Sequence, residues 1–145
     1  MTTTAEQTRA RYPDESGRLD RDGVRIHWER YGDGDPAILF LPTWSIAPSR
    51  IWKAQIPYFA RRGRVLVFDP RGNGCSDRPL DPSAYAETAF ADDARAVLDA
   101  TGTGRAVVVG FVAGVHPIVI AKVEAWCILI TDTFVAVGMH PLFAD

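Results

Sequence analysis

Residues 107–114 read Val107-Val108-Val109-Gly110-Phe111-Val112-Ala113-Gly114. The three valines form an apolar, β-branched run that is typical of a strand buried in a parallel sheet. Gly110 and Gly114 flank the next residues, as in a sharp turn whose neighbours must lack side chains so that strand and helix can approach closely. The stretch therefore predicts a strand, a tight turn and the start of a helix, with Val112 at the centre of the turn.

The segments on both sides of this stretch alternate between strand and helix. Apolar runs predict strands at 37–41, 64–68, 106–109 and 126–130. Residues at helical spacing predict helices over 50–61, 83–100 and 111–124. Pro57 should kink or shorten the first of these helices. This alternation indicates βαβ units and an α/β fold, with a mainly parallel sheet flanked by helices.

The N-terminal part of the chain has a different pattern. Asp22-Gly23 separates residues 18–20 from residues 24–31, where apolar and polar side chains alternate, and this predicts a β-hairpin. The chain then divides into three parts. They are a flexible polar N-terminal arm (1–18), a partial α/β domain (19–132) and an irregular C-terminal tail (133–145).

The composition favours small-molecule chemistry or protein contact over binding to nucleic acid or to a membrane. The 145 residues are 47% hydrophobic and carry a net charge of -2, with both signs mixed along the chain. Residues 1–11 contain no apolar signal segment, and no apolar stretch is long enough to span a bilayer. Cys75 and Cys127 have no metal-ligand spacing and suggest no disulfide framework, so we expect no metal and a cytoplasmic location.

Residues 110–114 also fit the pattern of a nucleophile elbow, Gly-x-Ser-x-Gly, with Val112 at the position of the serine. In this context the chain resembles the α/β-hydrolase superfamily. The most specific match is Asp69-Pro70-Arg71-Gly72-Asn73-Gly74-Cys75-Ser76-Asp77-Arg78-Pro79, which fits that family's Asp-x-Arg-Gly-x-Gly-x-Ser-x-x-Pro loop after its fourth strand. Residues 37–44 resemble the family's third strand and oxyanion loop, and residues 91–110 resemble the helix and strand before the elbow.

The resemblance implies a fold, a reaction class and a set of site residues. It implies hydrolysis of an ester, epoxide, amide or carbon–halogen bond in a small molecule, without a metal or cofactor. The nucleophile position falls on Val112, the elbow glycines on Gly110 and Gly114, and the oxyanion-hole N–H groups on Trp44 and Ala113. A structural loop that supports the site falls on Asp69, Arg71, Gly72 and Gly74. We expect a partial α/β-hydrolase fold whose C-terminal strands are missing and whose sheet ends near Ile128.

Val112 has no nucleophilic atom, and the chain after it leaves little room for the acid and histidine that the family places on later strands. If the elbow kept its family geometry, a β-branched residue there would be strained by about 1–3 kcal/mol. His116 and His140 are interpreted as structural or terminal residues rather than as displaced bases. No catalytic residue is therefore intact.

Three hypotheses for the whole chain follow. The first is a catalytically inactive or truncated relative of a small-molecule, ester-type hydrolase. The second is a noncatalytic module that binds a small-molecule ligand or self-associates through an open sheet edge. The third is an active hydrolase in which Ser45 or Ser76 replaces the missing nucleophile, although neither has an evident histidine partner.

Overall fold

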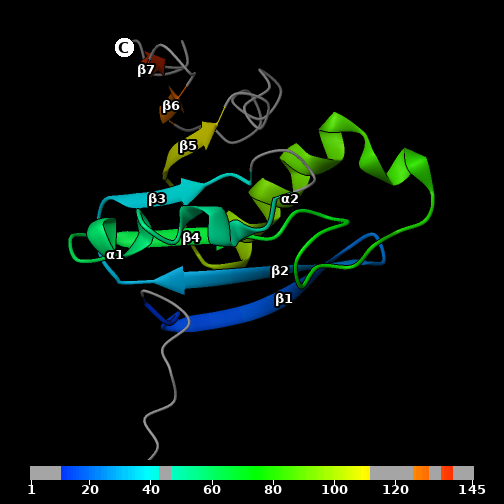
Figure 1. The fold of residues 1–145 in the computed structure, drawn as a ribbon, viewed down its shortest axis with the longest axis horizontal. Helices are drawn as coiled ribbons and strands as arrows, with labels where there is room; N and C mark the ends of the chain where they lie inside the picture. The colour runs from blue at the N-terminus through cyan, green and yellow to red at the C-terminus, as the bar shows by residue number, and fades with distance from the viewer. Residues whose placement is uncertain (1–10, 43–46, 112–125, 131–134, 139–145) are drawn as a thin grey trace, which may run out of the picture.

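The computed structural model describes residues 11–42, 47–111, 126–130 and 135–138, and its strands lie in one sheet (Figure 1). These strands are β1 (Glu15–Arg21), β2 (Val24–Tyr31), β3 (Ala37–Phe40), β4 (Arg64–Phe68), β5 (Val107–Phe111), β6 (Trp126–Ile130) and β7 (Val135–Gly138). They form a seven-stranded sheet in the order β1-β2-β4-β3-β5-β6-β7. The bounds of β2, β4 and β6 are those expected from the sequence.

The sheet is parallel in its middle and antiparallel at both sides. Strand β3 pairs parallel with β4 and with β5, and β5 pairs parallel with β6. The hairpin β1/β2 and the pairs β2/β4 and β6/β7 are antiparallel. The predicted partial α/β-hydrolase fold is confirmed, including its N-terminal hairpin. Asp22 and Gly23 form the hairpin turn at positive φ, 54° and 81°, as a two-residue turn between antiparallel strands requires.

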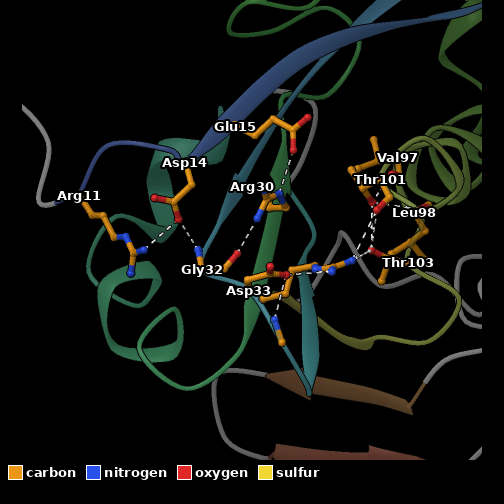
Figure 2. Close-up of polar contacts among 12 residues, drawn as sticks. Arg11, Asp14, Glu15, Arg30, Gly32, Asp33, Val97, Leu98, Thr101 and Thr103 are labelled. Atoms are coloured by element: carbon orange, nitrogen blue, oxygen red, sulfur yellow. Dashed lines mark hydrogen bonds and ion pairs between the residues drawn. The ribbon is translucent and has the colours of Figure 1, made fainter.

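Strands β3 and β5 differ from the expected strands by one or two residues at their ends, and two boundaries of the domain differ by more. Strand β1 begins at Glu15, inside the segment interpreted as a flexible arm, because Arg30 of β2 donates to the Glu15 carboxylate at 3.0 Å. The Asp14 carboxylate also accepts a hydrogen bond from the Gly32 N–H at 2.6 Å (Figure 2). Polar side chains thus stabilise the start of β1. At the other side the sheet does not end at β6, since β7 lies in the segment expected to be irregular. Only four residues separate β6 from β7, and an antiparallel pair allows such a short connection.

Strand β4 is buried on both faces, as its continuous apolar sequence predicts. Val65 and Val67 pack on one side with Trp52 and Ile56, which lie in η1 (Ser49–Trp52) and α1 (Ile56–Phe59). Leu66 and Phe68 face the opposite layer, which contains α2 (Glu87–Ala100). The buried residues that α2 contributes to this layer are Ala91, Ala94, Val97 and Leu98. The molecule thus has helical segments on both faces of the sheet (Figure 1).

The helices are shorter than the periodicity predicts. The expected helix over 50–61 is divided into η1 and α1, with Pro57 in the first turn of α1, because proline lacks the N–H that an upstream helix would need. The expected helix over 83–100 begins only at Glu87, after η2 (Pro82–Tyr85), because Ala86 is extended with ψ 144°. Of the helix expected over 111–124, Phe111 is the last residue of β5 instead, and residues 112–124 lie outside the described residues. Among the described residues, no helix has the length and apolar character needed to cross a bilayer.

Candidate functional site

The candidate site lies at the carboxyl edge, which we define as the edge of the sheet where β3, β4 and β5 end. Because these parallel strands are neighbours, the loops that follow them converge there, as ligand-binding loops of open α/β sheets do. Gly110 lies in β5, paired with Leu129 of β6. The other elbow and oxyanion candidates lie outside the described residues, and their roles stay predictions: Trp44, Val112, Ala113 and Gly114.

Asp69 directly follows β4 and ties two loops together at the carboxyl edge. Its side chain is buried, and its two carboxylate oxygens accept the N–H groups of Ser49 and Cys75, each at 2.8 Å. Ser49 begins η1 after the β3 loop, whereas Cys75 belongs to the loop after β4. Within the described part of the chain, no arginine or lysine forms an ion pair with this carboxylate. Among the described residues, Asp69 therefore orders both loops through backbone donors.

Gly72 and Gly74 allow the loop after β4 to turn back on Asp69. Both have positive φ, 85° and 52°, which side-chain-bearing residues rarely adopt. A Cβ at Gly74 would lie 2.2 Å from Oδ2 of Asp69, and a Cβ at Gly72 would lie 2.7 Å from the Tyr85 ring. Glycine at position 74 thus lets the backbone approach the buried carboxylate, and glycine at position 72 lets it pass the Tyr85 ring.

Among the described residues, Arg71 forms no hydrogen bond or ion pair with Asp69, although the sequence placed both in one supporting loop. Its guanidinium instead donates to both oxygens of Asp93 on α2, at 2.8 and 2.7 Å, and to the Ala84 carbonyl. Asp93 is fully buried, and burial raises the pKa of Asp93 above its ordinary value against the pull of Arg71. The sequence analysis missed Asp93, yet a signal existed: the aspartate lies on the apolar stripe of the helix, three residues after Phe90 and four before Val97.

The hydroxyl of Ser76 is already used within the fold. Ser76 is buried, its Oγ donates to the Asp69 carbonyl at 2.7 Å, and it accepts the His27 N–H at 2.9 Å. A serine that acts as a nucleophile needs a base to take its proton. Here the proton is directed at a backbone carbonyl, so the geometry favours a structural role.

Ser76→Ala is expected to lower the free energy of unfolding by about 1–3 kcal/mol, because the change leaves a buried N–H and a buried carbonyl without their partner. Urea unfolding followed by circular dichroism measures this loss. Ser16→Ala, at an exposed position of β1, is the control and should change the stability by less than about 0.5 kcal/mol. Equal values for the two variants would contradict a structural role for the hydroxyl.

Asp77 attaches the same loop to β2. The Arg25 guanidinium donates to both of its carboxylate oxygens, at 3.0 and 3.2 Å, and the Arg25 N–H donates at 3.0 Å. These hydrogen bonds, those of the guanidinium first, hold the pKa of Asp77 below its ordinary value of 3.8. A lowered carboxyl pKa stabilises the fold above the unfolded value, and this contribution is lost as the pH falls through the folded value.

The free energy of unfolding is therefore expected to fall as the pH drops below about 3.8, and to fall less in Asp77→Asn, which cannot titrate. Urea unfolding at a series of pH values from roughly 6 to 2.5 measures the slope. The fall should be reduced rather than abolished, because the Gly32 N–H lowers the pKa of Asp14 and Arg64 lowers that of Asp33. Parallel curves for wild type and variant would refute the contribution of Asp77.

Asp69 and two other side chains that can bind a metal ion lie close together at the carboxyl end of β4. Ligand atoms of His27, Asp69 and Cys75 all lie within 4.8 Å of one another. The cysteine is exposed and has a free thiol, and Nε2 of His27 lies 3.4 Å from Oε1 of Glu29. Sequence spacing gave no sign of this group and led to the expectation of no metal. His27 reaches Asp69 only because β2 pairs antiparallel with β4.

Two of the hollows on the described surface lie near the ends of the central strands. One is lined by Glu29, Tyr31 and Ser49 together with the basic residues Arg11, Arg50 and Lys53. The other lies at the opposite edge of the sheet from the candidate site, where β3 and β4 begin, and its lining includes Asp33 and Thr103 (Figure 2). Ser49 of the first hollow also binds Asp69 at the carboxyl edge, but this hollow, at about 20 Å³, has room only for water.

Comparison with known proteins agrees with this geometry. Residues 36–114, more than half of the chain, match the alpha/beta hydrolase fold family. The bifunctional esterase/perhydrolase DCH of Acinetobacter calcoaceticus is 36% identical over 96 residues, which cover 65% of this chain and 34% of that protein. Epoxide hydrolase 4 of Mus musculus is 30% identical over 97 residues, covering 64% of this chain and 26% of the enzyme.

Solved structures show the same likeness. Est816, described as an N-acyl homoserine lactone degrading enzyme, superposes with a TM-score of 0.60 at 41% identity, over 65% of this chain and 35% of its own. Epoxide hydrolase VrEH1 of Vigna radiata superposes with a TM-score of 0.62 at 29% identity, over 69% and 32%. The chain thus spans between about a quarter and about a third of the length of these relatives. With the fold, the loop after β4 and the family match in agreement, this chain belongs to the alpha/beta hydrolase fold family.

Proposed function

We propose that this chain is an α/β-hydrolase-like protein that does not itself carry out the hydrolysis typical of the family. The observation that carries the proposal is the motif Gly110-Phe111-Val112-Ala113-Gly114, which has valine where the elbow needs a nucleophile. Backbone donors of an oxyanion hole survive such a replacement, whereas the attacking atom does not. The chain would then keep the scaffold of the family without its first chemical step.

The environment of Ser76 supports the proposal. This serine is the described candidate for a substitute nucleophile, and its hydroxyl is enclosed between the His27 N–H and the Asp69 carbonyl. Attack on a substrate would require both hydrogen bonds to break in a buried setting, which costs about 1–3 kcal/mol for the unpaired groups. Ser45 is the second candidate, and the experiment below tests it directly.

The relatives indicate which small molecules to test. They include an esterase/perhydrolase, epoxide hydrolases and an enzyme that degrades N-acyl homoserine lactones. An ester, an epoxide and a lactone are therefore the substrate classes for this scaffold. A ligand of one of these classes could still bind at the carboxyl edge without being cleaved.

The test measures hydrolysis of p-nitrophenyl acetate, an aryl epoxide and an N-acyl homoserine lactone by the purified 145-residue chain. We expect rates equal to those of buffer for wild type, Ser45→Ala and Ser76→Ala. A dispersed amide NMR spectrum of the same sample shows that the assayed chain is folded. Saturable turnover that either alanine variant abolishes would overturn the proposal and identify the substitute nucleophile. Saturable turnover that survives both changes would overturn it as well.

Self-association through the sheet edge is the second candidate function. Its supporting observation is that β7 is the last strand in the order of the described sheet, with β6 on one side and no described strand on the other. An edge strand offers unpaired N–H and C=O groups to a second chain. Size-exclusion chromatography with light scattering is expected to give a defined dimer. A monomer across a hundredfold range of concentration would rule this candidate out.

A cytoplasmic location is also part of the proposal. The exposed free thiol of Cys75 supports it, because reducing compartments keep such thiols from forming disulfides. Fractionation of cells that express a tagged chain tests this point, and recovery in a secreted or periplasmic fraction would contradict it.

A further inference from the structure

His27, Asp69 and Cys75 come from three separate parts of the sequence and meet at the carboxyl end of β4. An imidazole, a carboxylate and a thiol together form a ligand set that suits Zn²⁺, a borderline-soft cation. Their ligand atoms lie within 4.8 Å of one another. We propose that these three residues bind one Zn²⁺ ion.

The backbone holds the three residues in place before any metal binds. The Asp69 N–H donates to the His27 carbonyl at 2.9 Å, and the Ser76 hydroxyl links the His27 N–H to the Asp69 carbonyl. The Cys75 N–H donates to the Asp69 carboxylate itself. Hydrogen bonds thus join the backbones of the first and second ligands and tie the third ligand to the second.

The distances require only a small adjustment. Zinc lies about 2.0–2.3 Å from nitrogen, oxygen and sulfur ligands, so ligand atoms of a tetrahedral site are about 3.5 Å apart. The present atoms must therefore move closer together by about 1.3 Å at most. Cys75 is exposed and can change its side-chain rotamer at little cost, whereas Asp69 is fixed and buried.

The local charge favours a cation. Asp69 is 4% exposed, and its carboxylate has two backbone donors but no ion pair within the described residues. A buried carboxylate without a counter-charge is costly, and a bound dication would supply that charge. The Glu29 carboxylate lies 3.4 Å from the His27 ring and adds negative charge beside the site. On binding, the Cys75 thiol gives its proton to the buffer and coordinates as the thiolate.

Cobalt is the direct probe, because Co²⁺ bound to a thiolate absorbs in the near ultraviolet. Titration of the reduced full chain with Co²⁺, followed by displacement with Zn²⁺, is expected to show one metal per chain and a thiolate-to-cobalt band. Cys75→Ser should abolish the band. It should also weaken Zn²⁺ binding more than the loss of a residue that only supports a ligand, which costs about 10–100-fold in affinity. Cys127→Ser is the matched control and should leave both unchanged.

Zn²⁺ should also raise the unfolding temperature of wild type and of Cys127→Ser, but not of Cys75→Ser. His27→Gln provides a second ligand variant that leaves the cysteine intact, and it should weaken Zn²⁺ binding without removing the thiol. Circular dichroism establishes that each variant is folded. A band that persists in Cys75→Ser, a band lost in Cys127→Ser, or no stoichiometric metal binding by wild type would overturn the proposal. None of these readouts depends on hydrolytic activity.

Discussion

Asp93→Ala is expected to lower the free energy of unfolding by about 3–5 kcal/mol, because it leaves the Arg71 guanidinium buried without its carboxylate. The Asp93 side chain is fully buried and accepts two short hydrogen bonds from Arg71, at 2.8 and 2.7 Å. Arg71 in turn holds the Ala84 carbonyl, so the pair joins the loop after β4 to α2 and to η2. Its loss should therefore destabilise the candidate site as well as the fold.

Urea unfolding measures this change in the free energy of unfolding. Two further variants show whether the unpaired guanidinium causes it. Asp99→Ala removes an exposed aspartate from the same helix and should cost less than about 0.5 kcal/mol. The double variant Arg71→Met/Asp93→Leu removes both charges and should be more stable than Asp93→Ala, because the buried Arg71 guanidinium is no longer left unpaired. Arg21, whose Nε lies 3.7 Å from Asp93, keeps Asp22 and Asp92 as partners in both variants. If the double variant were less stable than the single one, the unpaired guanidinium would not be the cause of the loss.

Gly74→Ala is expected to destabilise the chain by about 2–5 kcal/mol through two additive terms. A left-handed backbone costs about 1–2 kcal/mol for a residue that carries a Cβ, and Gly74 has φ 52°. The new Cβ would also lie 2.2 Å from the Asp69 carboxylate, which the Ser49 and Cys75 N–H groups hold in position. Crowding of this kind adds about 1–3 kcal/mol.

Gly23→Ala separates the two terms. Gly23 also has positive φ, at 81°, but a Cβ there meets nothing within 4 Å. This control should therefore show the backbone term alone, and thermal or urea unfolding of both variants gives the difference. Equal losses for Gly74→Ala and Gly23→Ala would show that the Asp69 carboxylate yields to the methyl group. The close approach of loop and carboxylate would then not depend on glycine.

The sequence predicted much of the central fold because the signals there are local. The bounds of β4 follow from the five strand-forming residues between Gly63 and the Asp69-Pro70 turn. Those of β2 follow from the alternation of apolar and polar side chains, which a glycine ends. The hairpin turn follows from Asp22-Gly23, which tolerates positive φ. Helix boundaries were less accurate, because periodicity does not show where the backbone leaves the helix at Ala86.

The candidate site divides in the same way. Val112 at the centre of the elbow motif, and the glycines of the loop after β4, can be read from the chain alone, since each is a matter of residue type at a given spacing. Two other features could not be predicted in this way. They are the ion pair of Arg71 with Asp93 and the cluster of His27, Asp69 and Cys75. These contacts depend on how β2 pairs with β4 and how α2 packs on the sheet, and such registers join residues 22 to 48 positions apart. Residue type alone thus showed that valine stands at the nucleophile position of the motif, and only tertiary structure decided which side chains meet at the carboxyl end of β4.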